Sequence, residues 1–198
     1  MAGALDPAGP SVCLRRRIQD PEGVLELHDG DTLLVRHDRI PLRTRTAGSV
    51  ALTMCVPSLP ELDGLFAELR RVLRPTGTVA ALVPARPNRT IGEIRAWWPL
   101  HRALGGRPTF RHEAARDHLH WLITSADFAV LADERRTFRL PVPDAGSARA
   151  VADGLVRDGV WPPDVAGELL GRAREALVRY AGRGATLPIP LRLLVARR

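Results

Sequence analysis

Residues 49–83 read SVALTMCVPSLPELDGLFAELRRVLRPTGTVAALV and predict a strand, a helix and a second strand in succession. Residues 49–56 form a nearly continuous apolar run, as in a strand that is covered on both faces. Within residues 62–73 the apolar positions recur at steps of three and four, which gives a helix one apolar stripe. Residues 78–83 form a second apolar run. Strand, helix and strand with short connections make one βαβ unit, which predicts a parallel sheet with a right-handed crossover.

The N-terminal side of this unit contains a hairpin signal. Two β-type runs, at residues 24–28 and 32–36, flank Asp29-Gly30-Asp31. Glycine accepts the positive φ of a tight turn, so we expect a β-hairpin here. The alternative is a parallel pair, but the hairpin is favoured because three residues are far too few for a crossover. Residues 1–11 are small and contain Pro and Gly, and we expect them to be disordered.

The C-terminal side continues with helices and strands. Helical periodicity predicts helices over residues 91–104, 113–125, 147–158 and 164–181. Apolar runs predict a strand or a strand pair over residues 128–131 and 135–142, and a last strand over residues 189–196. A chain of 198 residues suits one α/β domain, which we place at residues 12–198.

The composition is that of a globular protein, with 45% hydrophobic and 26% charged residues. No run approaches the roughly 20 apolar residues that span a bilayer, so we expect no membrane association. The N-terminus lacks a basic start followed by an apolar run, and we therefore expect a cytoplasmic protein without a signal peptide. The cysteines, Cys13 and Cys55, have no paired spacing, which argues against a disulfide framework and a cysteine-based zinc site.

The basic charge raises the question of nucleic-acid binding. The formal net charge is +7, and all 29 basic residues are arginine. These arginines are spread along the chain in short groups, which favours a solvated arginine-coated surface. We therefore expect nucleic acid to be an unlikely partner.

The string from Leu62 to Val79 resembles a hallmark of class I S-adenosylmethionine-dependent methyltransferases, especially the small-molecule group often called type 11. In that family a helix ends in E-x-x-R-V-L-(R/K)-P-G-G before the fifth strand. Here Thr76 replaces the first glycine of the pair. Three other segments are more loosely similar to family elements: residues 38–42 to D-x-x-x-L-P-F before the fourth strand, residues 126–130 to the entry of the sixth strand, and residues 187–197 to the last strand.

The resemblance implies an α/β fold with a Rossmann-like methyltransferase sheet. That sheet would be mostly parallel, with helices on both faces and an antiparallel C-terminal strand. The resemblance also implies S-adenosylmethionine as cofactor and a small molecule as substrate.

The sequence departs from the family where the cofactor is held. The family uses an (E/D)-x-G-x-G-x-G loop after the first strand and an acidic residue at the end of the second strand, which binds the ribose hydroxyls. Glycines in such a loop let the backbone approach the ligand closely. Here the glycines at positions 3, 9, 23 and 30 are not clustered. Three explanations stay open: a missing front half, a front half shortened to a β-hairpin with loss of the cofactor site, or a front half supplied by a partner chain.

Two residues are candidates for cofactor binding. Asp38 matches a family position near the adenine, and Pro57 directly follows the first apolar strand. Asp38 also belongs to a polar cluster with His28, Asp29, Asp31 and His37, whose side chains could serve as metal ligands or as an acid/base pair. The alternative for this cluster is a hairpin turn with solvated sides.

Tryptophans are the candidates for substrate binding. Trp97, Trp98 and Trp121 could line a pocket, because aromatic walls suit flat or apolar small molecules. Core packing is the alternative for each. Because Trp97 and Trp98 are adjacent, they face different directions, and we expect one of them to be exposed or at an interface.

Histidines near Trp121 do not form a metal motif. His112, Glu113, His118 and His120 show neither HxxxH nor HExxH spacing, and we expect no metal site. One of these histidines could serve as a general base, because histidine titrates near neutral pH.

We therefore expect a methyltransferase-like protein of small-molecule metabolism with a degenerate cofactor site. The alternative is a non-catalytic partner subunit or ligand-binding module of the same fold, and whether the chain is an enzyme stays open. A shortened front half would leave a sheet edge uncovered, which a homodimer or a partner chain could hide.

Overall fold

The computed structural model describes residues 11–16, 24–29, 31–87 and 90–198. Contacts group the chain into two compact units. The first unit takes in residues 1–83, 111–135 and 192–198, and the second takes in residues 84–110 and 136–191. The single domain expected over residues 12–198 stays a prediction.

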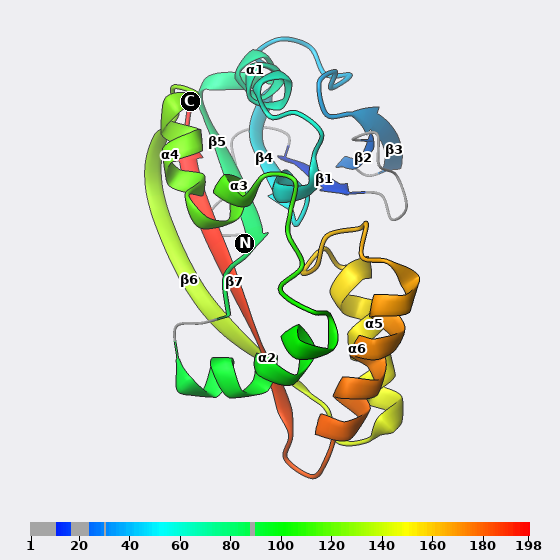
Figure 1. Cartoon of the computed structure of the whole chain (residues 1–198). Coiled ribbons are helices and arrows are strands. Elements are labelled where there is room, and N and C mark those ends of the chain that lie inside the picture. The colour runs from blue at the N-terminus through cyan, green and yellow to red at the C-terminus, as the bar shows by residue number, and fades with distance from the viewer. Residues whose placement is uncertain (1–10, 17–23, 30, 88–89) are drawn as a thin grey trace. The chain divides into compact units, whose positions relative to one another are not determined.

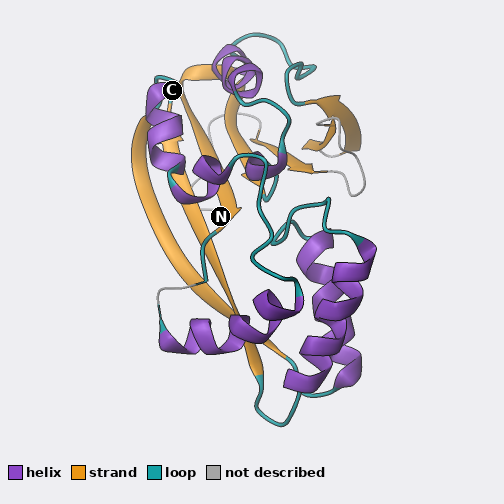
Figure 2. Cartoon of the chain, viewed as in Figure 1, coloured by secondary structure: helices purple, strands orange, loops and turns teal. Residues whose placement is uncertain are grey.

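The described strands form a seven-stranded sheet in the order β3-β2-β1-β4-β5-β7-β6 (Figure 1). Their bounds are β1 Ser11–Arg16, β2 Val24–Asp29, β3 Asp31–Arg36, β4 Ala47–Thr53, β5 Leu73–Pro84, β6 Ala129–Pro141 and β7 Thr186–Arg197. The chain combines this sheet with helices, which is the expected α/β fold (Figure 2).

Parallel pairing is found at the centre of the sheet. Strand β4 pairs in parallel with β1 and with β5, and Leu52 lies opposite Leu14 on one side and Ala81 on the other. Strand β2 is antiparallel to β1, and β3 is antiparallel to β2. The expected βαβ unit is therefore present, but the sheet is mixed, with its parallel pairs at β1, β4 and β5.

Strand β7 runs antiparallel to its neighbour β5, as expected. The amide of Arg198 donates to the carbonyl of Gly77 at 2.9 Å, and the amide of Ala85 donates to the carbonyl of Pro190 at 2.9 Å. Residue numbers therefore rise along β5 in the direction in which they fall along β7, so the two strands are antiparallel.

The N-terminal part of the sheet contains one strand that the sequence did not predict. The hairpin exists, because β2 and β3 pair with His28 opposite Thr32, although Gly30 lies outside the described residues. Strand β1, which the sequence analysis missed, inserts between this hairpin and β4. Ser11, expected to be disordered, is the first residue of β1, and residues 1–10 lie outside the described residues.

The described α-helices follow the predicted periodicity with one break. Their bounds are α1 Asp63–Val72, α2 Ile91–Ala103, α3 Glu113–Asp117, α4 Leu119–Ser125, α5 Ala145–Arg157 and α6 Gly167–Tyr180. The helix expected over residues 113–125 is divided at His118, whose φ of −130° and ψ of 35° are not helical. The strand or strand pair expected over residues 128–142 is the single strand β6. No described helix has the length and apolar character that crossing a membrane requires.

Each unit has its own apolar core. In the first unit, Leu65 and Leu69 of α1 are fully buried with Leu14, Leu52 and Val79 of the sheet. In the second unit, α2, α5 and α6 bury residues such as Trp97, Leu100, Leu155, Trp161 and Leu177. Helices α5 and α6 lie side by side in Figure 2.

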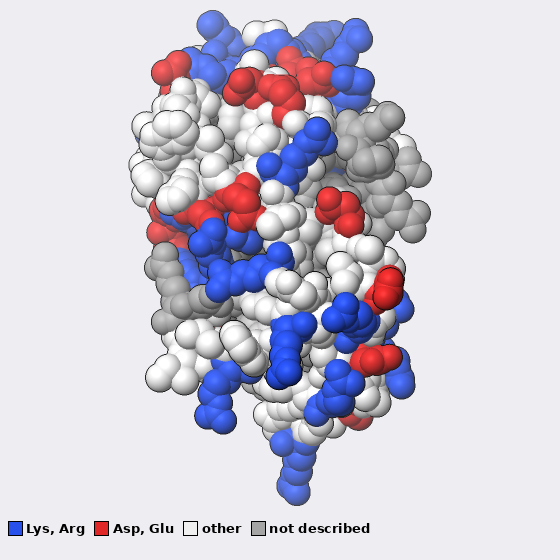
Figure 3. Space-filling view, in the orientation of Figure 1, with Lys and Arg blue, Asp and Glu red and all other residues white. Residues whose placement is uncertain are grey.

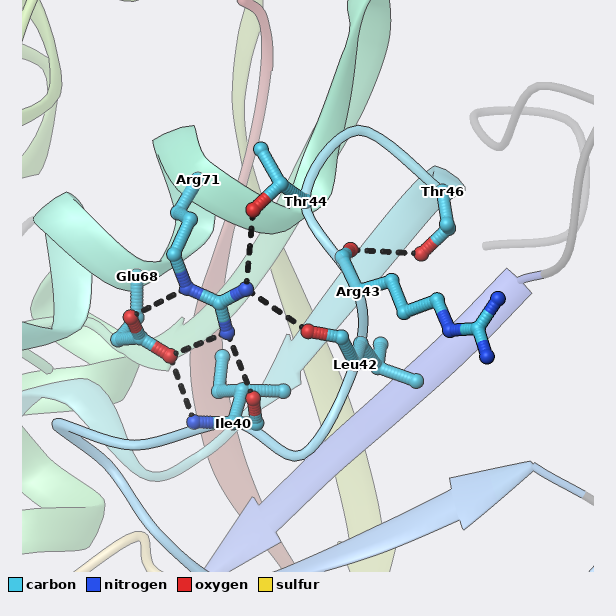
Figure 4. A network of polar contacts seen from close by, with 7 residues as sticks. All are labelled: Ile40, Leu42, Arg43, Thr44, Thr46, Glu68 and Arg71. Atoms are coloured by element: carbon cyan, nitrogen blue, oxygen red, sulfur yellow. Dashed lines mark hydrogen bonds and ion pairs between the residues drawn. The ribbon is translucent and has the colours of Figure 1, made fainter.

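The return from β3 to β4 is made without a helix. These strands run in the same direction, and residues 37–46 connect them. Because a parallel return usually contains a helix that satisfies its own backbone, this segment needs other partners. Helix α1 supplies them through Arg71 and Glu68 (Figure 4).

Arg71 holds the segment by its guanidinium group. Its Nη2 donates to the carbonyl of Ile40 at 2.7 Å, and its Nη1 donates to the carbonyl of Leu42 at 2.8 Å. Its Nε and Nη2 also donate to the Glu68 carboxylate at 2.7 and 2.8 Å, and that carboxylate accepts the Ile40 amide at 2.8 Å. We call Glu68 and Arg71 the α1 clamp.

Candidate functional site

The parallel strands β1 and β4 form the topological switch point of the sheet. After β1 the chain moves outward to β2 and β3, and after β4 it moves the opposite way to β5. In open α/β sheets, ligands bind beyond the carboxyl ends of the strands at such a point. The candidate site therefore lies beyond Arg16 and Thr53, where these two strands end.

The backbone turns sharply at the end of β4. Met54, the next residue, has a φ of 55°, which is uncommon for a residue with a side chain, and its amide donates to the carbonyl of Leu82 at 2.8 Å. The short helix η2, Val56–Ser58, follows directly. Strained backbone of this kind is often found at binding sites, which makes the turn at Met54 a candidate part of one.

Two buried polar atoms lie beside this turn. The amide of His112 donates to the carbonyl of Pro57 at 3.0 Å, which places the start of α3 against η2. The Oγ of Ser58 and the Nε2 of His112 are both buried, and neither has a hydrogen-bond partner among the described residues. A buried polar atom without a partner costs stability, and a ligand is one explanation for keeping it.

The segment after β3 reaches the same edge of the sheet, because β3 runs parallel to β1. His37 is buried, and its Nε2 lies 4.0 Å from the Oε2 of Glu61. Glu61 in turn accepts the amide of Gly64 at 2.9 Å, in the first turn of α1. A Cβ at Gly64 would lie 2.7 Å from Glu61 Oε2 and 3.0 Å from the Cβ of Asp38, so Gly64 packs closely against both residues.

Asp38 is held by its neighbour Arg36. The Nε and Nη2 of Arg36 donate to the two carboxylate oxygens of Asp38 at 2.9 and 2.8 Å. The hydrogen bond from Arg36 lowers the pKa of Asp38 to about 2, so its carboxylate is ionised at neutral pH. Its predicted role in cofactor binding stays a prediction, and a ligand would have to share this carboxylate with Arg36.

The other predicted site residues lie in different surroundings. Pro57 is buried in η2. Trp97 is buried in the core of the second unit, where its Nε1 donates to the carbonyl of Pro188 at 2.7 Å. Trp98 in the second unit and Trp121 in the first are 63% and 62% exposed. The predicted roles of these residues in ligand binding stay predictions.

No metal-ligating cluster of three or more His, Cys, Asp or Glu residues exists among the described residues. The polar cluster of five residues named in the sequence analysis is described only in part. The side chains of His28, Asp29 and Asp31 lie outside what is described, whereas His37 and Asp38 follow β3. His118 and His120 are exposed.

The end of β2 differs from the arrangement that the resemblance implies for holding S-adenosylmethionine. In that family an acidic residue at the end of the second strand binds the ribose, and here Asp29 ends β2. Because β2 is antiparallel to β1, with His28 opposite Cys13 and Leu25 opposite Arg16, Asp29 lies beside the amino end of β1. It is therefore at the opposite edge from the switch point. Residues 17–23, which follow β1, contain one glycine and lie outside the described residues.

Sequence reasoning considered His112 only as one of several histidines and missed Ser58. A signal for Ser58 was present, because a hydroxyl residue lies between Pro57 and Pro60, shortly after a central apolar strand. Polar residues at the carboxyl end of such a strand are candidates for ligand contact. Tertiary packing brings His112 to Pro57 and η2, which no local pattern could predict.

A scan of protein-family models finds no match to this chain, and a search of curated proteins finds no relative either. In fold, the chain resembles solved structures of class I S-adenosylmethionine-dependent methyltransferases. The geranyl diphosphate C-methyltransferase of Streptomyces coelicolor is 10% identical, with a TM-score of 0.40, over 84% of this chain and 53% of that one.

Two further structures are similar at the same level. The YcgJ protein of Bacillus subtilis is 12% identical, with a TM-score of 0.45, over 83% of this chain and 69% of that one. The [4+2]-cyclase SpnF is 17% identical, with a TM-score of 0.46, over 83% of this chain and 54% of that one. The chain thus spans roughly half to two thirds of the length of these structures, and at such identities the likeness concerns the fold alone.

Proposed function

We propose that this chain is a methyltransferase-like ligand-binding module, in which a small polar molecule binds at the carboxyl end of β4. We further propose that S-adenosylmethionine is not held there in the family's manner. The observation that carries the ligand site is the pair of buried polar atoms without partners, Oγ of Ser58 and Nε2 of His112, and the direction of β2 carries the cofactor part. The partner chain or homodimer and the cytoplasmic location expected from the sequence stay predictions.

The polar groups that would meet the ligand are the Oγ of Ser58 and the Nε2 of His112. Each is buried without a partner among the described residues, so each would gain a hydrogen bond when a polar ligand arrives. The turn at Met54 and the bond between His112 and Pro57 hold η2 and α3 in place. A ligand site of this kind needs no bound cofactor.

Titration with S-adenosylmethionine and S-adenosylhomocysteine tests the cofactor part of the proposal. We expect calorimetry of the purified chain to give a Kd weaker than about 1 mM for both, because the end of β2, where the resemblance implies a ribose-binding residue, lies at the opposite edge from the switch point. A Kd of about 10 μM or tighter would contradict the proposal and would restore methyl transfer as the leading function.

His112→Phe tests the ligand site itself. The substitution removes a buried atom that lacks a partner, so we expect the free energy of unfolding of the ligand-free chain to stay the same or to rise by up to about 1 kcal/mol. Urea unfolding followed by circular dichroism measures it. A loss of more than about 1 kcal/mol would mean that the imidazole is a structural group.

A thermal-shift screen against small polar metabolites supplies the positive measurement. A ligand of this site raises the Tm of the native chain, because it binds the folded state only. His112→Phe and Ser58→Ala should each abolish that shift, whereas His118→Phe, at an exposed histidine between α3 and α4, should leave it unchanged. A shift that persists in both site variants would place the ligand elsewhere.

A further inference from the structure

The second unit contains a hollow of about 610 Å³ between helices α2 and α6. Successive turns of the two helices supply its walls: Trp98, Pro99, Arg102 and Ala103 from α2, and Arg172, Glu175, Ala176, Arg179 and Tyr180 from α6. Its size lies within the range of small-molecule pockets. The hollow is unrelated to the site at the end of β4, and nothing in that proposal depends on it.

The charges in the hollow are unbalanced. Three arginines and one glutamate line it, which leaves a net charge of about +2. Arg179 and Glu175 form an exposed pair at 3.9 Å, which is weak. The guanidinium groups of Arg102 and Arg172 have no hydrogen bond or ion pair to any described residue, and they come from the two different helices. These groups are therefore available to an anion.

An aromatic surface lies beside these charges. Trp98 is 63% exposed, although its neighbour Trp97 is buried in the core. The ring of Tyr180 is fixed, because its hydroxyl donates to the carbonyl of Thr186 at 2.8 Å. The exposed indole of Trp98 offers a flat face for stacking.

We infer that the hollow between α2 and α6 binds a phosphate ester that carries a flat ring, of which a mononucleotide is the simplest example. Arginines bind phosphate oxygens through paired N–H donors, and Arg102 and Arg172 supply such donors from two helices. Trp98 supplies the stacking surface for the ring. The volume favours a small molecule over a polymer, and Figure 3 shows basic side chains scattered with acidic ones over the visible face.

Calorimetric titration at low salt with adenosine monophosphate, adenosine and inorganic phosphate tests the inference. We expect the nucleotide to bind at least about tenfold more tightly than either of its parts, because only the nucleotide uses both the arginines and the indole. The double variant Arg102→Gln/Arg172→Gln should weaken nucleotide binding by about tenfold or more. Trp98→Leu should weaken it by a similar factor.

A matched control separates this site from general surface charge. Arg149→Gln/Arg157→Gln removes the same charge from α5, outside the hollow, and should leave the affinity unchanged. The inference is overturned if the nucleotide does not bind, or if the two double variants weaken binding equally. It is also overturned if a single-stranded oligonucleotide binds with a steep salt dependence and the mononucleotide does not, since the surface would then be a polyanion site.

Discussion

Arg71→Leu is expected to lower the free energy of unfolding of the first unit by about 3 kcal/mol. The substitution removes the guanidinium that binds the Glu68 carboxylate and the carbonyls of Ile40 and Leu42. Glu68 has only 15% of its side chain exposed, so its charge is left largely buried without its main partner. Urea unfolding followed by circular dichroism measures the loss.

The loss should extend beyond one side chain, because the whole return from β3 to β4 depends on α1. The last carbonyls of α1, at Arg71 and Val72, accept the amides of Arg45 and Thr46 at 2.9 Å each. The α1 clamp and these bonds together satisfy a backbone that has no helix of its own. Hydrogen exchange of the Arg45 and Thr46 amides should therefore accelerate in Arg71→Leu.

Arg43→Leu is the matched control for this prediction. It removes the same charge from the same segment, but the Arg43 side chain points away from the clamp in Figure 4 and is exposed. We expect its effect on the free energy of unfolding to stay within about 0.5 kcal/mol. If the two variants lost equal stability, net charge would be the cause and the clamp would not.

The clamp should also make stability depend on pH. The hydrogen bond from Arg71 lowers the pKa of Glu68 below its ordinary value. A carboxylate whose folded pKa is lowered contributes stability above its unfolded pKa, about 4.3, and loses that contribution as the pH falls through the folded value. Glu68→Gln should therefore flatten the decline of stability below about pH 4. In the Arg71→Leu background, the same substitution should flatten it much less.

The βαβ unit was predictable because each of its parts has a strong local pattern. The apolar run of β4 and the stripe of α1, with Leu65 and Leu69, are both buried as expected. Strand β1 was not predictable in this way, because Val12, Cys13 and Leu14 form a run of only three apolar residues next to arginines. Its place in the sheet depends on parallel pairing with β4, which is distant in the sequence.

The candidate site was less predictable than the fold. Asp38 could be selected from a family resemblance, but its bidentate pairing with Arg36 depends on the turn after β3. The α1 clamp could not be predicted either, because in the sequence Arg71 is one of several basic residues in the last turn of a helix. Only the irregular return of residues 37–46 shows why an arginine is needed at that position.

Trp97→Leu is expected to lower the free energy of unfolding of the second unit by about 3 kcal/mol. Trp97 is 3% exposed and packs edge-on against Trp161, with ring centroids 6.2 Å apart. The substitution leaves a cavity and removes the donor that binds the carbonyl of Pro188. It also uncovers the ring of His101, which lies 5.6 Å from the indole and whose pKa burial lowers to about 4.

Trp98→Leu is the matched control, since it changes the same residue type one position further along α2. Because Trp98 is 63% exposed, its replacement should change the free energy of unfolding by less than about 0.5 kcal/mol. The pair of variants thus separates packing from binding: Trp97→Leu should cost stability, and Trp98→Leu should cost only nucleotide affinity. If Trp97→Leu left stability intact and abolished ligand binding, Trp97 would belong to a binding site and its assignment to the core would be wrong.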